Sequence, residues 1–385
     1  MVVRWVGGSV VVRRVGCPAV RGTLRRDPCN VGGVSAAFHT TPGYCAHPAP
    51  RSDPDSDREA STYPDTALRT YLERLEEALS SAESEGEIPE LALLSGAKED
   101  QIGVALCSID GEITSVGSEH AFPVQSISKA FAYGAAIDLH GLDYVTSIVD
   151  EEPTGEEFNA LSLDPVTKKP KNPLVNIGAI RTHAMLGPTQ QERTKRLRDV
   201  LDAAAGRTLE VHEETRKVEL ETADRNLALA YMLRAAGSMD ENAQDVVGGY
   251  TEGCSVLVSV ADLAVMAATL AGGGTNPITG VEVFSRVASR QVLSVMLTCG
   301  MYDNAGDWVS DVGIPAKSGV GGGIIAALPS RFGIATYAPQ LDQHGNSVRG
   351  TLAFERISED FALHMLDGQE PTDLERRAEE LVRLP

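Results

Sequence analysis

Strand-like segments occur at two places far apart in this chain, and this distribution constrains the fold more than any other feature. Two short apolar runs flank Asp110-Gly111, a dipeptide typical of β-hairpin turns. Strand-like segments return late, over residues 323–328, 332–338 and 348–356. We therefore expect one antiparallel sheet built from both ends of a domain.

The region between these segments is predicted to be helical. Apolar spacing followed by glycine predicts helices over residues 129–140, 223–236 and 261–271. Ser259 and Asp262 form a capping-box pattern at the start of the last one. A helix is also expected over residues 66–79, and an acidic amphipathic helix near the C-terminus. The predicted class is α/β of the α+β type, with a helical subdomain packed against the sheet.

The first sixty residues differ in charge from the rest of the chain. They hold eight Arg, no Lys and five acidic residues, whereas the remainder is strongly acidic. The Arg-rich start has the bias of an organelle transit peptide, but Gly and Pro interrupt it and a Pro- and Asp-rich stretch follows. We expect a disordered Arg-rich extension and linker over residues 1–61, a catalytic domain over 62–368 and a charged helical tail over 369–385.

Composition excludes several functions. The net charge of −20 disfavours nucleic acid, which needs a basic face. The sequence contains no run of eighteen or more uncharged apolar residues, so no membrane span is predicted. The six Cys residues contain no Cys-x-x-Cys pair, so neither a disulfide framework nor a zinc site is predicted. A reducing compartment, the cytoplasm, fits this composition best.

The stretch "VQSISK" contains the first candidate for catalysis. A helix that begins near Ser126 places Lys129 almost one turn further on, on the same face. Burial of Lys129 would favour its neutral amine, which could then accept the proton of the Ser126 hydroxyl. Ser-x-x-Lys alone is a weak signal, because most such spacings are solvated helix faces.

A second motif strengthens the first. Lys317-Ser318-Gly319 precedes the predicted strand of residues 323–328, which resembles the placement of Lys-Thr-Gly in serine β-lactamases and penicillin-binding proteins. The glycines that follow leave backbone N–H groups available as oxyanion donors. Tyr302, in a loop before this motif, is a candidate second base or a tyrosine buried for packing. Together these residues indicate a serine-acylating site.

Two further stretches suggest recognition of an amino acid. Glu219 and Asn226 are seven residues apart, so on one helix they share a face, as a ligand clamp or as a solvated surface. The carboxylate would suit an ammonium group and the amide a carboxylate. Asn176 lies in an apolar run and needs hydrogen-bond partners, either in a site or as a brace for the turn after Pro173.

Eight stretches, in order along the chain, resemble the glutaminases of the serine-dependent type: "VQSISKAF", "NPLVNIGAI", "ETADRNLALAY", "CSVLVS", "MAATLAGGGTNPITG", "LTCGMYD", "PAKSGVGGGI" and "GNSVRG". The resemblance covers about residues 64–365. It implies hydrolysis of L-glutamine to L-glutamate and ammonia through a glutamyl-serine intermediate, on a β-lactamase-like or penicillin-binding-protein-like fold. It also implies no metal or organic cofactor, and assembly into dimers or tetramers.

The resemblance also implies roles for individual residues. Ser126 would be the nucleophile, Lys129 its base and Tyr302 a proton shuttle, with the backbone N–H groups of Ser126 and Val320 as the oxyanion hole. Lys317, Ser318 and Gly319 would support the site. The residues expected to bind glutamine are Gln125, Asn176, Glu219, Asn226, Tyr250, Tyr302 and Val320.

The chain departs from the family pattern at two positions. Glu87 replaces a tyrosine expected to touch the substrate, and Ile177 replaces an alanine beside Asn176. A carboxylate at Glu87 is expected to repel the substrate carboxylate and weaken binding. Three alternatives remain at this point: a β-lactamase or peptidase, a glutamine-binding protein without turnover, and an amidase for another amide.

Overall fold

The computed structural model describes residues 2–6, 9–13, 66–82, 84–155, 160–368 and 373–383. The chain divides into two units, Met1–Ser61 and Thr62–Pro385. In the first unit, strand β1 (Val2–Val6) pairs antiparallel with β2 (Ser9–Arg13). The predicted disordered extension falls mostly outside the described residues and stays a prediction.

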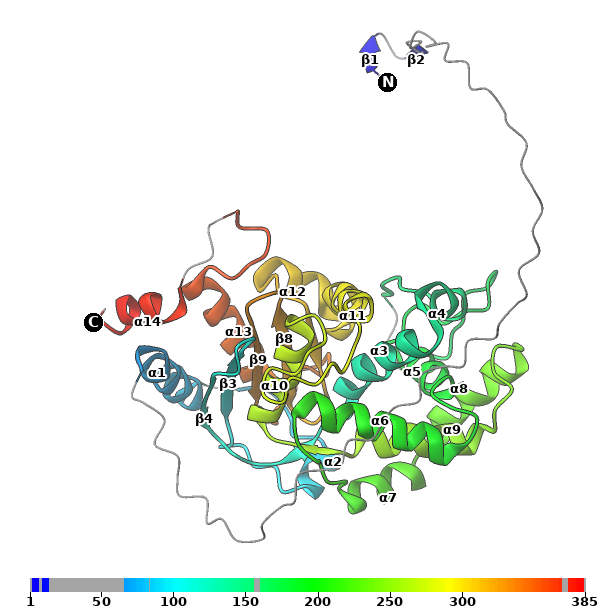
Figure 1. Ribbon diagram of the computed structural model, residues 1–385, viewed down its shortest axis with the longest axis horizontal. Helices are drawn as coiled ribbons and strands as arrows, with labels where there is room; N and C mark the ends of the chain where they lie inside the picture. The colour runs from blue at the N-terminus through cyan, green and yellow to red at the C-terminus, as the bar shows by residue number, and fades with distance from the viewer. Residues whose placement is uncertain are drawn as a thin grey trace, which may run out of the picture. The chain divides into compact units, whose positions relative to one another are not determined.

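A five-stranded antiparallel sheet of order β4-β3-β9-β8-β7 forms the centre of the second unit (Figure 1). Its N-terminal strands β3 and β4 flank the predicted Asp110-Gly111 turn, and β3 pairs with the C-terminal strand β9 from Gly103↔Tyr337 to Ser108↔Phe332. The prediction that both ends of the domain build one sheet is therefore confirmed. The strands are β3 (Gly103–Ser108), β4 (Ile113–Gly117), β7 (Ala316–Ser318), β8 (Gly323–Leu328) and β9 (Phe332–Tyr337).

Apolar cores cover both faces of the sheet because successive side chains of a strand point to opposite faces. Val104 and Leu106 of β3 belong to one core cluster, whereas Ala105 and Cys107 belong to the other. Helix α10 (Val260–Ala271) packs in the second cluster, and its Ser259–Asp262 capping box is present as predicted. The first cluster is built with α1 (Ala67–Ser81), α12 (Ala305–Asp311), α13 (Val348–Phe361) and α14 (Leu374–Val382).

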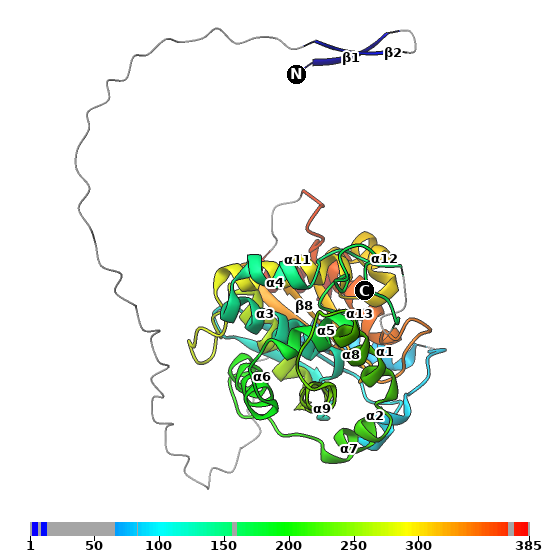
Figure 2. The same cartoon turned by 90° about the vertical axis from the view of Figure 1, so that its right-hand side faces the viewer.

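A helical region lies to the side of the sheet away from α1 and α14, and Figure 2 views it from the front. Its own core cluster includes buried residues of α5, α8 and α9. A two-stranded sheet, β5 (Phe122–Pro123) with β6 (Leu257–Val258), leads into the region. The remaining helices are α2 (Glu90–Leu94), α3 (Ser128–His140), α4 (Leu142–Ile148), α5 (Asn176–Ala184), α6 (Gln190–Ala205), α7 (Glu213–Glu221), α8 (Asp224–Ala235), α9 (Ala243–Cys254) and α11 (Arg286–Cys299).

One predicted strand is wrong: residues 348–356 belong to helix α13. Ser347 caps this helix by accepting the Gly350 N–H at 3.1 Å. Helical spacing is followed by the buried residues Ala353, Phe354, Ile357 and Phe361. This spacing becomes visible only when more residues are considered than the nine of the predicted strand, 348–356.

The structure thus has a mixed α/β architecture, with an antiparallel sheet and a helical region. No helix in the described part of the chain has the length and apolarity needed to cross a bilayer.

Candidate active site

Ser126 lies at the start of the first helix of the helical region, as predicted. The Val124 N–H donates to the Val256 carbonyl at 2.7 Å, and a single 3-10 turn, η1 (Gln125–Ile127), then leads into α3. Gln125 has a φ of +50°, a conformation that non-glycine residues rarely adopt. Such conformations persist only where the surrounding structure holds them, and they cluster at functional sites.

The Lys129 amine is enclosed by neutral acceptors. Its side chain is 1% exposed, and Nζ donates to the Leu174 carbonyl at 3.1 Å and to Asn176 Oδ1 at 2.6 Å. Burial lowers the pKa of Lys129 to about 8, because a charged amine is costly in an apolar environment. About one tenth of this amine is therefore neutral at pH 7.

A neighbouring asparagine, Asn172, braces the turn that presents Asn176. Asn172 Oδ1 accepts the Leu174 N–H at 3.0 Å and the Val175 N–H at 3.1 Å. A Cβ at Gly178 would collide with the Asn172 carbonyl, so only glycine fits there. Of the two roles considered for Asn176, bracing the turn thus belongs to Asn172, and Asn176 contacts Lys129 instead.

Tyr302 connects the Ser126 segment to the glycine-rich turn. It begins a 3-10 turn, η2 (Tyr302–Asn304), and has a φ of +55°. Its hydroxyl donates to the Ser318 carbonyl at 3.2 Å and makes hydrogen bonds with the Ser126 side chain and the Val320 backbone N–H. Burial raises the pKa of Tyr302, so it is a phenol rather than a phenolate at neutral pH.

Lys317 lies directly behind Tyr302. Its amine is fully buried, 4.3 Å from the centre of the Tyr302 ring, and donates to the carbonyls of Gly300 and Ser318. Burial holds the pKa of Lys317 well below its ordinary value. Lys317 and Ser318 belong to the separate short strand β7, and the glycine turn after it includes Gly319 and joins β7 to β8.

A cavity of about 190 Å³ brings together six of the seven residues predicted to bind glutamine, whereas Tyr302 lines a separate cavity of about 120 Å³. Seven predicted residues line it: Gln125, Ser126, Asn176, Glu219, Asn226, Tyr250 and Val320. The sequence interpretation missed four others: Leu91, Thr222, Thr251 and Cys254. One signal was available, because Cys254 follows Tyr250 by four residues on α9 and so lies on the same helical face.

Glu219 and Asn226 reach this cavity from two different helices. The prediction of a single shared helix is wrong, because α7 ends at Glu221 and α8 begins at Asp224. Ser255 Oγ donates to Glu219 Oε2 at 3.4 Å, and the Gln125 side chain also bonds this carboxylate. Burial raises the pKa of Glu219 to about 7. Asn226 Oδ1 accepts from Asn176 Nδ2 at 3.1 Å.

The two departures from the family pattern lie away from the cavity wall. The Glu87 side chain is exposed and is not among the cavity-lining residues, while its backbone pairs with Leu341. The expected repulsion between Glu87 and the substrate therefore has no support in this geometry. Ile177 is 3% exposed and packs in the core of the helical region.

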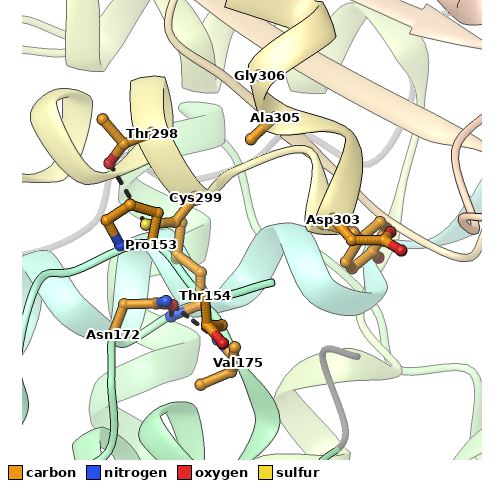
Figure 3. A pocket seen from close by; sticks show the side chains of 11 residues that line it. Pro153, Thr154, Asn172, Val175, Thr298, Cys299, Asp303, Ala305 and Gly306 are labelled. Atoms are coloured by element: carbon orange, nitrogen blue, oxygen red, sulfur yellow. Dashed lines mark hydrogen bonds between the residues drawn. The ribbon is translucent and has the colours of Figure 1, made fainter. Parts of the chain in front are cut away.

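Two other cavities formed by the described residues lack the candidate nucleophile. A cavity of about 120 Å³ next to Tyr302 is lined by Thr298 and Cys299 at the end of α11 and by Thr154 and Asn172 of the facing segment (Figure 3). A larger cavity of about 550 Å³ runs beside α11. Neither contains Ser126, so size alone does not identify the site. In the described ranges, no group of three or more His, Cys, Asp or Glu side chains could hold a metal ion.

A hydroxyl at the wall of a small cavity, with a partly neutral amine and a phenol near it, is an arrangement suited to nucleophilic catalysis. The family model described as Glutaminase matches residues 85–366. The chain is 43% identical over 315 residues to the glutaminase of Corynebacterium efficiens, covering 80% of this chain and 74% of that protein. It is 42% identical over 328 residues to the glutaminase of Microcystis aeruginosa, covering 85% and 96%. This chain belongs to the glutaminase family.

Solved structures agree with this family. The structure of Mglu in its glutamate form has a TM-score of 0.75 at 43% identity, covering 78% of this chain and 70% of that one. The probable glutaminase ybaS has a TM-score of 0.74 at 31% identity, covering 78% and 99%. The protein is accordingly a hydrolase that converts glutamine to glutamate.

Proposed function

We propose that this glutaminase works through a glutamyl ester on Ser126, with Lys129 as the base. The observation that carries the proposal is the Lys129 amine, which is buried, bonded to neutral acceptors and lowered in pKa to about 8. A serine hydroxyl needs such a base to become a nucleophile. Ser126 lies three residues before this amine, at the entrance of the same helix.

In the acylation step, Ser126 Oγ attacks the side-chain amide carbon of glutamine while Lys129 takes the hydroxyl proton. The Tyr302 phenol, bonded to Ser126, gives its proton to the leaving nitrogen and regains one from Lys129. The C–N bond breaks, ammonia leaves, and the glutamyl group remains on Ser126. The N–H groups of Ser126 and Val320 stabilise the negative oxygen of the tetrahedral intermediate, and the Val320 N–H exchanges its bond to the Tyr302 hydroxyl for this oxygen.

Deacylation reverses these roles. A water molecule attacks the ester carbon and passes a proton to the same Lys129 and Tyr302 pair. The C–O bond to Ser126 breaks, Oγ recovers its proton, and glutamate leaves. Lys317 supports both steps through the Ser318 carbonyl, because Lys317 Nζ and the Tyr302 hydroxyl both donate to it.

Recognition of the amino-acid end of glutamine falls to the other cavity residues. Glu219 holds the ammonium group, and it needs its charge to do so. Asn176, Asn226 and Tyr250 supply hydrogen bonds for the carboxylate, and Gln125 closes the wall beside Glu219. A neutral zwitterion has little net attraction to or repulsion from the acidic surface.

We also propose that the fold is of the β-lactamase and penicillin-binding-protein type. The support is a Ser-x-x-Lys helix start next to a Lys-Ser-Gly segment at the edge of an antiparallel sheet. Assembly into dimers or tetramers, a cytoplasmic location and the absence of a cofactor stay predictions.

The test uses the full chain with L-glutamine, and measures ammonia, glutamate and the mass of the Ser126 peptide after an acid quench. We expect equal release of both products and a glutamyl adduct on Ser126, with both abolished in Ser126→Ala. Ser128→Ala is the matched control, because Ser128 donates to the Gln125 carbonyl and does not line the cavity. Glutamate release by Ser126→Ala, or an adduct on another residue, would overturn the proposal. L-asparagine as a paired substrate tests the choice of amide.

A further inference from the structure

The turn of residues 342–347 contacts Tyr302 and both of its chain neighbours. His344 Nδ1 lies 3.0 Å from Asp303 Oδ1, and Asn346 Nδ2 lies 3.4 Å from the Met301 carbonyl oxygen. Between them, the Gly345 backbone faces the phenol ring, since a Cβ there would lie 3.6 Å from Tyr302 Cε2. Three consecutive residues of the turn therefore meet three consecutive residues around Tyr302.

The same turn also reaches the glycine-rich segment. A Cβ at Gly345 would lie 3.8 Å from Cγ1 of Val320, whose backbone N–H bonds the Tyr302 hydroxyl. Gly345 has a φ of +89°, so a side chain at this position would be strained, although there is room for a Cβ. The open side of Gly345 thus faces both partners of one hydrogen bond in the site.

The turn is itself internally fixed. Asp342 Oδ1 accepts the His344 N–H at 2.8 Å and the Asn346 N–H at 2.9 Å, and the Asp342 N–H donates to the Asn346 carbonyl at 2.8 Å. Ser347 Oγ donates to the Ala338 carbonyl at 2.6 Å, which ties the turn to the end of β9. A rigid turn can hold a neighbouring segment in place, whereas a mobile one cannot.

Tyr302 needs such external support. Its positive φ is unfavourable for a residue with a Cβ, and such conformations persist where the surroundings over-determine them. The contacts from Lys317 and Ser318 hold the ring and hydroxyl, but they leave the backbone on either side of Tyr302 to other contacts. Asn346 provides one such contact at the Met301 carbonyl, and His344 holds the next residue, Asp303, through its side-chain carboxylate.

We propose that the 342–347 turn is a positioning element that sets the Tyr302 hydroxyl between Ser126 and Val320, with His344 and Asn346 as positioning residues. The proposal rests on the proton-shuttle role of Tyr302 in the proposed function. The His344–Asp303 contact is the accessible part, because the two side chains are 32% and 40% exposed. Cutting this contact leaves the apolar core untouched, unlike replacement of Asn346, which is 1% exposed.

The kinetic test compares His344→Ala and Asp303→Ala, alone and combined, in the full chain. We expect each to lower kcat roughly three- to tenfold, about the loss of one modest hydrogen bond, with KM within about twofold. The double variant should be no worse than either single one, because both remove the same contact. His344→Gln, which keeps a donor for Asp303, should restore most of kcat. His364→Ala is the matched control. His364 Nε2 lies 2.8 Å from the Val309 carbonyl oxygen, a contact that does not involve Tyr302.

The decisive comparison uses Tyr302→Phe. A residue that acts through the Tyr302 hydroxyl has no further effect once that hydroxyl is gone, so His344→Ala should cost nothing in this background. An equal fold-loss in the presence and absence of the hydroxyl would overturn the proposal. Full activity of Tyr302→Phe alone would instead refute the shuttle role, and with it the catalytic meaning of the turn.

A spectroscopic readout is independent of activity. In protein labelled with ring-¹³C tyrosine, the Tyr302 resonance is identified by its loss in Tyr302→Phe. We expect His344→Ala to shift or broaden this resonance and His364→Ala to leave it unchanged. An unmoved Tyr302 resonance in His344→Ala would show that the turn does not position the ring, whatever the outcome for the glutamyl-serine mechanism.

Discussion

Asn176→Asp gives the sharpest test of Lys129 as the base. This substitution preserves the shape of the side chain but places a carboxylate oxygen where Asn176 Oδ1 now accepts from Lys129 Nζ at 2.6 Å. A nearby opposite charge favours the protonated amine. It raises a lysine pKa by about 1 to 3 units at this kind of distance. The base is active only when neutral, so the change displaces activity toward alkaline pH.

The magnitude follows from the pKa of about 8 for Lys129. At pH 7, about one tenth of an amine with this pKa is neutral; after a rise of about 1 to 3 units, the neutral fraction falls about 10- to 1000-fold. The measurement is kcat/KM for glutamine, by ammonia release, from about pH 6 to pH 10. The unchanged enzyme should gain activity with rising pH through about 8, and Asn176→Asp should recover at correspondingly higher pH.

Asn226→Asp is the matched control for this experiment. Asn226 Oδ1 accepts from Asn176 and not from Lys129. A carboxylate at position 226 is therefore separated from the Lys129 amine by the Asn176 side chain. Its pH profile should move less than that of Asn176→Asp. If Asn176→Asp loses activity without any displacement of the acid limb, Lys129 is not the base and the reasoning fails.

Two further predictions concern binding and stability. Glu219→Gln should raise KM for glutamine about 10- to 100-fold with little change in kcat, because a charge-assisted hydrogen bond contributes about 1.5–3 kcal/mol. The control Glu221→Gln, at the exposed end of the same helix, should change neither KM nor kcat. An unaltered KM for Glu219→Gln would show that this carboxylate does not bind the ammonium group. Leu72→Ala should lower the free energy of unfolding by about 2–5 kcal/mol in a denaturant titration, because Leu72 is fully buried in α1. Leu93→Ala, at a residue that is 53% exposed, should cost less than about 1 kcal/mol. Similar losses for the two leucines would contradict the packing of α1.

Most of the sheet could be predicted because its signals are local. The Asp110-Gly111 turn and short apolar runs are read within a few residues, and the pairing of both ends follows because the region between them is predicted to be helical. The helix at residues 348–361 was mistaken for a strand because apolar residues near its start fit both periods. Its Ser347 cap was the signal that distinguished them.

The candidate site was predictable to the extent that its chemistry lies in short motifs. Ser126 and Lys129 share one helix start, and Lys317 and Ser318 share one short strand. By contrast, the break between Glu219 and Asn226 carries no glycine or proline, so the sequence suggested a single helix. The structural role of Asn172 could not be predicted, because Asn172 and Asn176 lie close together in the sequence. Only the folded structure shows that Asn172 braces the turn and that Asn176 contacts Lys129.

The pairing of β3 with β9 has a consequence for the synthesis of the protein. These strands are adjacent in the sheet but more than two hundred residues apart in the chain. Such long-range contacts slow folding, and a ribosome needs roughly 10–50 s to make the intervening segment. A nascent chain that ends before β7 carries Ser126 without Lys317 or the strand edge beside it. The glutaminase should therefore emerge as an inert chain and acquire a reactive serine only after the last strands are released.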